Sequence, residues 1–100
     1  MAEQTMALFI VQYSFSSASA PGRDDHRAAH REWLRGLLEQ ERLLVGGPYP
    51  DGTGAMAVVE APDRESVRNW FDDDPFLRED LVDELSVVEW VPTMGRVGAG

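Results

Sequence analysis

The chain contains no cysteine among its 100 residues. This absence excludes disulfide bonds, thiolate catalysis and cysteine-rich zinc sites, and it fits a reducing compartment. Long hydrophobic runs are also missing. No segment approaches the roughly 20 apolar residues that span a bilayer, and residues 1–13 lack the basic start and apolar stretch of a signal peptide. We therefore expect a cytoplasmic protein with no membrane partner.

Basic residues are few, with 9 Lys and Arg against 18 Asp and Glu and a net charge of -9. An excess of negative charge opposes binding to phosphate backbones, so nucleic acid is not an expected partner. The P-loop, the dinucleotide fingerprint and the Gly-x-Ser-x-Gly motif are absent too, so no nucleotide cofactor is expected. A chain of this length is expected to form a single domain over residues 1–100.

Apolar periodicity and turn-forming residues divide the chain into four strands and two helices. The predicted strands cover residues 6–15, 43–47, 54–61 and 84–91, and the predicted helices cover residues 24–41 and 63–73. Residues 14–22, rich in Ser, Ala and Pro, are expected to form a loop, and Asp63 is expected to cap the second helix. The β-α-β-β-α-β order predicts an α+β, ferredoxin-like fold: a four-stranded antiparallel sheet with two helices on one face.

The predicted strands are apolar at successive positions, whereas a strand with one face in water alternates with polar residues. The second face of the sheet is therefore expected to meet another protein surface. A homodimer with its sheets face to face would cover this surface and bury residues around Ile10, Val58 and Val88.

One of the two histidines, His30, falls on the apolar stripe of the first predicted helix, close to Leu34 and Leu37. A buried imidazole bonded to a backbone carbonyl is one interpretation of this position. The other is acid/base chemistry, because histidine exchanges protons near neutral pH.

Asp74 follows the apolar stripe that Val67, Trp70 and Phe71 define on the second helix, so its carboxylate is expected to face inward. Asp followed by Pro is also a good N-cap and first-turn pair for a new short helix. A carboxylate that caps a helix can still hold an imidazole in one tautomer, so the two interpretations are compatible.

The Gly47-Pro48 pair follows the second strand, either as a plain turn or as a place where the backbone comes close to a ligand. Arg27 could pair with an acidic substrate group or with Asp74, or could be an ordinary surface arginine. His26 and His30 have the spacing of two zinc ligands, but no third ligand stands at a fixed distance, so no metal site is expected.

Three short segments together resemble the YCII-related family. These are Arg27-Ala-Ala-His30, Leu43-Leu44-Val45-Gly46-Gly47-Pro48 and Asp74-Pro75-Phe76, which match the helical Arg-x-x-His, the Leu-Leu-x-x-Gly-Pro and the Asp-Pro-Phe or Asp-Pro-Tyr of that family. The resemblance covers residues 6–94 and implies a dimeric α/β barrel. Many relatives carry an Asp just after the first strand, where this chain runs Tyr13-Ser14-Phe15-Ser16. This chain therefore has no carboxylate at that position.

The resemblance implies a small-molecule enzyme that works without metal or nucleotide. It implies acid/base catalysis by His30 and Asp74 in a lyase or hydrolase step on a ring compound, since relatives include dehydrochlorinases of aromatic degradation. The expected substrate-binding residues are Arg27, Leu34, Gly47, Pro48, Trp70, Phe71 and Phe76. The alternatives are a cofactor-free monooxygenase or cyclase of secondary metabolism, and a non-catalytic ligand-binding or regulatory subunit.

Overall fold

Four antiparallel strands form one sheet in a computed structural model that describes residues 5–95. The strands are β1 (Ala7–Ser14), β2 (Leu43–Pro48), β3 (Gly54–Ala61) and β4 (Glu84–Trp90), and they lie in the order β2-β3-β1-β4. The central strand β1 pairs with both β3 and β4. This order and the placement of the helices confirm the predicted ferredoxin-like α+β fold.

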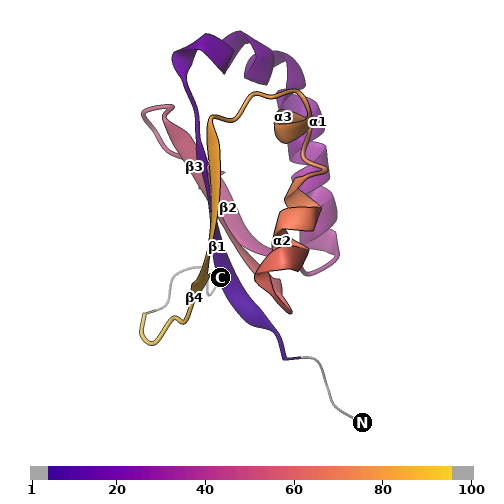
Figure 1. Ribbon diagram of the computed structural model, residues 1–100, viewed down its shortest axis with the longest axis vertical. Coiled ribbons are helices and arrows are strands. Elements are labelled where there is room, and N and C mark those ends of the chain that lie inside the picture. The colour runs from indigo at the N-terminus through magenta and orange to yellow at the C-terminus, as the bar shows by residue number, and fades with distance from the viewer. Residues whose placement is uncertain (1–4, 96–100) are drawn as a thin grey trace.

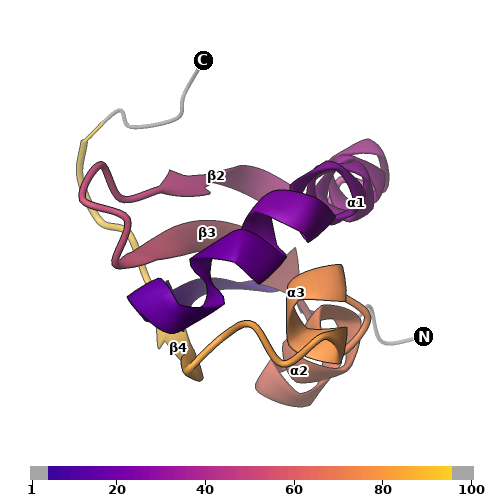
Figure 2. The same cartoon turned by 90° about the horizontal axis from the view of Figure 1, so that it is seen from above.

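All helices cover one face of the sheet, as Figures 1 and 2 show from two directions. They are the long helix α1 (Ala20–Glu39), α2 (Arg64–Phe71) and the one-turn helix α3 (Pro75–Arg78), with a short 3-10 helix η1 (Ser17–Ser19) before α1. The opposite face of the sheet carries no helix in the described residues 5–95 (Figure 2). None of the helices in this part of the chain is long and apolar enough to cross a membrane.

Helix α1 begins earlier than the sequence predicts. Residues 14–22 are not a plain loop, because η1 and the first turn of α1 lie within them. Pro21 occupies the first turn of the helix, where its missing N–H has no intrahelical partner to lose. The early start places Arg23 on the helix, and this residue is buried.

Helix α2 begins as predicted but ends early. The side chain of Asp63 accepts a hydrogen bond from the backbone N–H of Ser66 at 2.8 Å, which confirms the expected N-cap. The helix ends at Phe71 instead of near Asp73, and Asp74 has extended backbone angles. A proline disfavours helical geometry in the residue before it, so Pro75 ends the first helix and starts α3.

Strand β2 continues through Pro48, where the sequence predicts a turn. Pro48 lies opposite Ala55 in the register of β2 and β3. Because β2 is an edge strand, a residue without a backbone N–H is tolerated there. The turn itself follows one residue later, at residues 50–53.

The core lies between the sheet and the helices. Phe9, Val11 and Tyr13 alternate along β1 toward the helices and are buried, whereas Ile10 and Gln12 face the other way. Val67 and Phe71 of α2 are fully buried against this face. This face of the sheet and the helix layer together form the hydrophobic core.

Candidate functional site

His30 of α1 and Asp74 at the start of α3 form a close pair. The Nδ1 atom of His30 lies 2.7 Å from Oδ1 of Asp74. The Asp74 side chain is fully buried and that of His30 is 12% exposed. Two residues 44 positions apart are thus brought into hydrogen-bond contact by the packing of α3 on α1.

The carboxylate of Asp74 is surrounded by donors. Besides His30, the backbone N–H of Phe76 donates to Oδ1 at 3.0 Å, and the hydroxyl of Tyr13 donates to Oδ2. An ionised carboxylate only accepts hydrogen bonds, so the proton of the shared bond with His30 is assigned to Nδ1. The Nε2 atom then carries a lone pair and has no hydrogen-bond partner within residues 5–95.

Tyr13 is a site residue that the sequence analysis treats only as part of an apolar strand. Burial, the charge of Asp74 and the hydrogen bond to it all raise the pKa of Tyr13 far above its ordinary value. The phenol therefore stays protonated and acts as a donor to Asp74. No sequence pattern links it to a partner 61 positions away.

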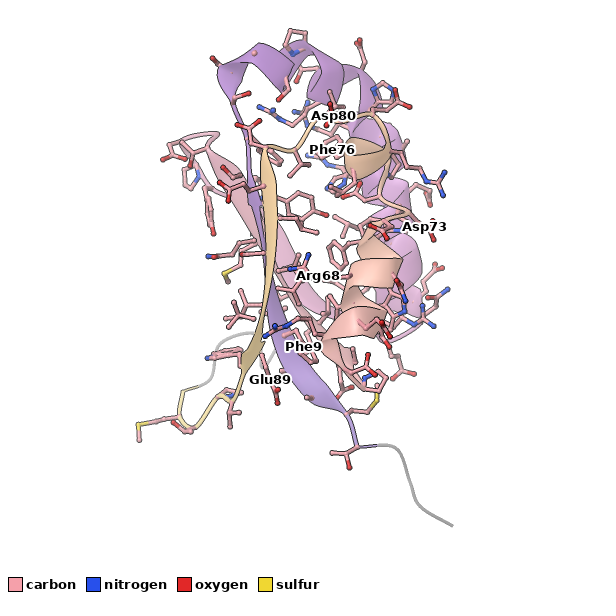
Figure 3. The ribbon with its side chains drawn as sticks, viewed as in Figure 1. Phe9, Arg68, Asp73, Phe76, Asp80 and Glu89 are labelled. Atoms are coloured by element: carbon pink, nitrogen blue, oxygen red, sulfur yellow. The ribbon has the colours of Figure 1, made fainter. Side chains whose placement is uncertain are left out.

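The imidazole of His30 is held from the side as well. It stacks on the ring of Phe76 and meets the ring of Tyr13 edge to face. The ring of Trp33 lies 6.2 Å from the imidazole and is tilted by 32° to it. Figure 3 places Phe76 on α3, in the space between the helices and the sheet. Hydrogen bonding and aromatic contact together leave the imidazole little freedom to rotate.

A cavity of about 290 Å³ lies beside this pair, between α1 and the sheet. Six residues predicted for the site line it: Arg27, His30, Leu34, Gly47, Pro48 and Phe76. The structure places His30, Gly47 and Pro48 around this one cavity. Tyr13, Phe15, Arg23 and Arg31 line the cavity too and are missing from the prediction.

Two predicted binding residues, Trp70 and Phe71, do not line the cavity. Phe71 is fully buried in the core, with its ring 6.1 Å from that of Tyr13. Trp70 lies farther from the site, beneath the guanidinium of Arg42 at 4.4 Å. The helical stripe indicates which residues face inward. The inward side of α2 packs on the hydrophobic core, and none of its residues lines the cavity.

Arg27 does not pair with Asp74. Its Nη1 donates to Oδ1 of Asp24 at 2.7 Å, three residues earlier on α1. The side chain still lines the cavity. With Arg23 and Arg31 it forms a row at four-residue spacing, which is a signal that the sequence carries and that could have identified the two missed arginines.

The two histidines do not converge on a common point. Nδ1 of His26 lies 3.0 Å from the carbonyl oxygen of Gly22, whereas Nδ1 of His30 faces Asp74. Within residues 5–95, no group of three or more His, Cys, Asp or Glu residues is arranged to hold a metal ion.

Comparisons with known proteins give one relative and two solved structures of interest. The Bacillus subtilis protein YjpA, itself uncharacterized, is 35% identical over 66 residues, which are 66% of this chain and 76% of YjpA. The structure of 5-chloro-2-hydroxyhydroquinone dehydrochlorinase (TftG) from Burkholderia phenoliruptrix AC1100, in complex with 2,5-dihydroxybenzoquinone, is 28% identical with a TM-score of 0.75. That match covers 84% of this chain and 93% of TftG.

A candidate antibiotic biosynthesis monooxygenase from Bacteriodes thetaiotaomicron VPI-5482 is also similar, at 14% identity and a TM-score of 0.59, over 90% of this chain and 91% of that one. At this identity the likeness concerns the fold alone. The family model of the YCII-related domain matches residues 6–91, which is most of the chain. The chain therefore belongs to the YCII-related family.

Proposed function

We infer that this protein is a small-molecule enzyme in which His30 is the general acid/base and the substrate is a ring compound. The observation that carries this proposal is the anchored imidazole: Nδ1 is bonded to the buried carboxylate of Asp74, His30 lines the cavity, and its Nε2 has no hydrogen-bond partner within residues 5–95. This arrangement suits proton transfer, because Asp74 orients the ring and stabilises the imidazolium that forms. Tyr13 and the backbone of Phe76 in turn hold the carboxylate.

The reaction we propose is an elimination of the kind named for TftG. Nε2 of His30 takes a proton from the substrate, and the electron pair released forms a new double bond in the ring compound. The leaving group departs with its own electron pair as an anion. The proton then passes from His30 to water, so the step needs no oxidant, metal or nucleotide.

The test uses 5-chloro-2-hydroxyhydroquinone as the first substrate and measures chloride release. His30→Ala is expected to lower turnover by roughly 10²–10⁴-fold, the usual contribution of a general acid/base. Asp74→Asn is expected to do less damage, because the imidazole remains but is poorly oriented. His26→Ala is the matched control, since His26 lies one turn earlier on α1 and does not line the cavity.

Ligand affinity separates an enzyme from a non-catalytic binding protein. In His30→Ala, binding of 2,5-dihydroxybenzoquinone should weaken much less than turnover, because the apolar wall of the cavity around Leu34 is intact. Full activity in His30→Ala contradicts the catalytic role. Binding that is lost in step with turnover favours a ligand-binding or regulatory subunit.

We further propose a homodimer formed through the open face of the sheet. Ile10 lies opposite both Val58 and Val88, so these three residues share the face that no helix covers within residues 5–95. Val88 is 52% exposed although it is apolar. Val58 is already buried within the single chain, so a stable interface of about 1,000 Å² or more would mainly cover Val88 and its exposed neighbours.

Light scattering at micromolar concentration tests the dimer. The native chain should have the mass of two copies, and Val88→Glu should reduce it toward that of one. Leu38→Glu is the control, because Leu38 is equally exposed, at 53%, but lies on α1. A monomeric native chain contradicts the proposal.

A further inference from the structure

The charged side chains that line the cavity beside His30 are basic, whereas the chain as a whole is acidic. Three arginines of α1 line it, whereas none of the described residues that line it is acidic. The chain as a whole has a net charge of -9. We propose that the guanidinium groups of Arg23, Arg27 and Arg31 select an anionic ring compound by binding a negatively charged oxygen. This inference rests on the proposed function, because it names the substrate class of the same cavity.

Arg23 provides the strongest argument. It is only 7% exposed, yet no carboxylate within residues 5–95 forms an ion pair with it. Its Nη1 donates to the carbonyl oxygen of Ser16 at 3.1 Å and to the hydroxyl of Ser19, and the guanidinium lies over the ring of Phe15 at 4.2 Å. These contacts fix the side chain without neutralising it.

A buried charge without a counter-ion is costly, so a position of this kind is well suited to an anionic ligand. A guanidinium has five N–H donors, and the two hydrogen bonds of Arg23 both come from Nη1. Donors on Nε and Nη2 remain for an oxygen of the ligand.

Arg27 and Arg31 extend the same row by one and two turns of α1. At four-residue spacing, neighbouring side chains on a helix are close enough to contact one small ligand. Arg27 forms an ion pair with Asp24, and the two side chains are 42% and 67% exposed. An exposed ion pair is weak, so Asp24 competes little with a bound anion for Arg27. Arg31 forms no ion pair within the described residues.

The position of the row relative to His30 suits an ionised hydroxyl or carboxyl group on the ring. Arg27 and Arg31 flank His30 on α1, so an oxygen held by the arginines keeps the ring within the reach of the imidazole. Low-dielectric walls strengthen the attraction between the arginines and an anion in the cavity. A neutral ring compound would gain none of it.

Calorimetric binding of two matched probes tests the proposal. The anion is 2,5-dihydroxybenzoate, and its neutral counterpart is 2,5-dihydroxybenzamide, which has the same ring and nearly the same shape. The native protein should bind the anion about tenfold more tightly or better, as one charge-assisted hydrogen bond predicts. Increasing the salt concentration should weaken the binding of the anion and leave the binding of the neutral probe unchanged.

The double variant Arg27→Gln/Arg31→Gln should reduce the preference for the anion to the part that Arg23 alone provides. It tests the row without altering the buried Arg23, whose replacement could interfere with folding. Arg35→Gln is the matched control: Arg35 is on the same helix, pairs with Glu32 at 3.0 Å and does not line the cavity. This control should keep the preference of the native protein.

Equal binding of the two probes by the native protein, or a preference that is unchanged in the double variant, would overturn the proposal. Failure of the anion to bind at millimolar concentration would overturn it as well. His30→Ala distinguishes this inference from the proposed function. It should keep the preference for the anion while it loses turnover, so full activity in that variant would contradict the catalysis and leave the arginine row supported.

Discussion

The imidazole of His30 lies flat against the ring of Phe76, with the two centroids 4.0 Å apart and the planes at 2° to each other. Phe76 also provides the backbone N–H that donates to Asp74. Phe76 therefore contacts His30 through its side chain and Asp74 through its backbone. A change of the side chain leaves the backbone contact in place and separates the two roles.

We expect Phe76→Leu to lower turnover by roughly tenfold, because the imidazole loses the surface that fixes its plane while His30 and Asp74 remain. Loss of an aromatic pair also reduces stability by about 0.5–1.5 kcal/mol. Phe76→Tyr, which keeps the ring, should restore most of the activity. Equal activity of the Leu variant and the native protein would show that the stacking has no positioning role.

Tyr13→Phe removes the hydroxyl that donates to Oδ2 of Asp74 and little else. The buried carboxylate then lacks one of its donors, so the free energy of unfolding should fall by about 1–3 kcal/mol. Turnover should fall as well, though by less than in His30→Ala. Tyr49→Phe is the control, because the hydroxyl of Tyr49 meets only the exposed Gln12. An unchanged unfolding curve in Tyr13→Phe would contradict the role assigned to this hydrogen bond.

The raised pKa of Tyr13 has a direct consequence at alkaline pH. A group whose pKa is higher in the folded than in the unfolded chain stabilises the fold fully below the unfolded value, here about 10, and this contribution declines as the pH rises above it. Tyrosinate absorbance of the native protein and of Tyr13→Phe should therefore coincide as long as the chain is folded. Extra tyrosinate signal from the folded native protein would show that Tyr13 ionises in place.

Gly54→Ala is expected to destabilise the protein. A Cβ on Gly54 would overlap the backbone carbonyl oxygen of Tyr13, which cannot move without disturbing β1. Overpacking of this kind costs about 1–3 kcal/mol, measurable by chemical denaturation. Gly47→Ala is the matched control, because a Cβ there would meet nothing within 4 Å. Similar unfolding midpoints for the two variants would contradict this account.

Local periodicity places both residues of the central pair on the inside, and the family resemblance is what marks them as site residues. His30 and Asp74 each fall on the apolar side of a segment, and both side chains point inward. The same reasoning failed for Trp70 and Phe71, because a helical stripe shows that a residue is inside but not which part of the interior it occupies. Their position depends on how far α2 extends along the sheet.

The partner of Tyr13 could not be predicted from periodicity. Tyr13 reads as one more apolar residue of β1, and its bond to Asp74 exists only because α3 packs above that end of the sheet. Arg23 falls between the predicted loop, residues 14–22, and the predicted helix, residues 24–41, so the sequence analysis does not place it on the helix. The helix begins at Ala20 nonetheless: Pro21 is compatible with a first turn, and the hydroxyl of Ser19 donates to the carbonyl oxygen of Leu81 at 3.2 Å.

The double use of Asp74, as N-cap of α3 and as partner of His30, links the chemistry of the site to the folding of a single helical turn. If α3 opens, the carboxylate loses its place and the imidazole loses its anchor in the same event. The hydrogen that the Phe76 amide donates to Asp74 is held only while this turn is closed. Its rate of exchange with deuterated solvent is therefore a residue-level measure of how often the protein is in a competent state.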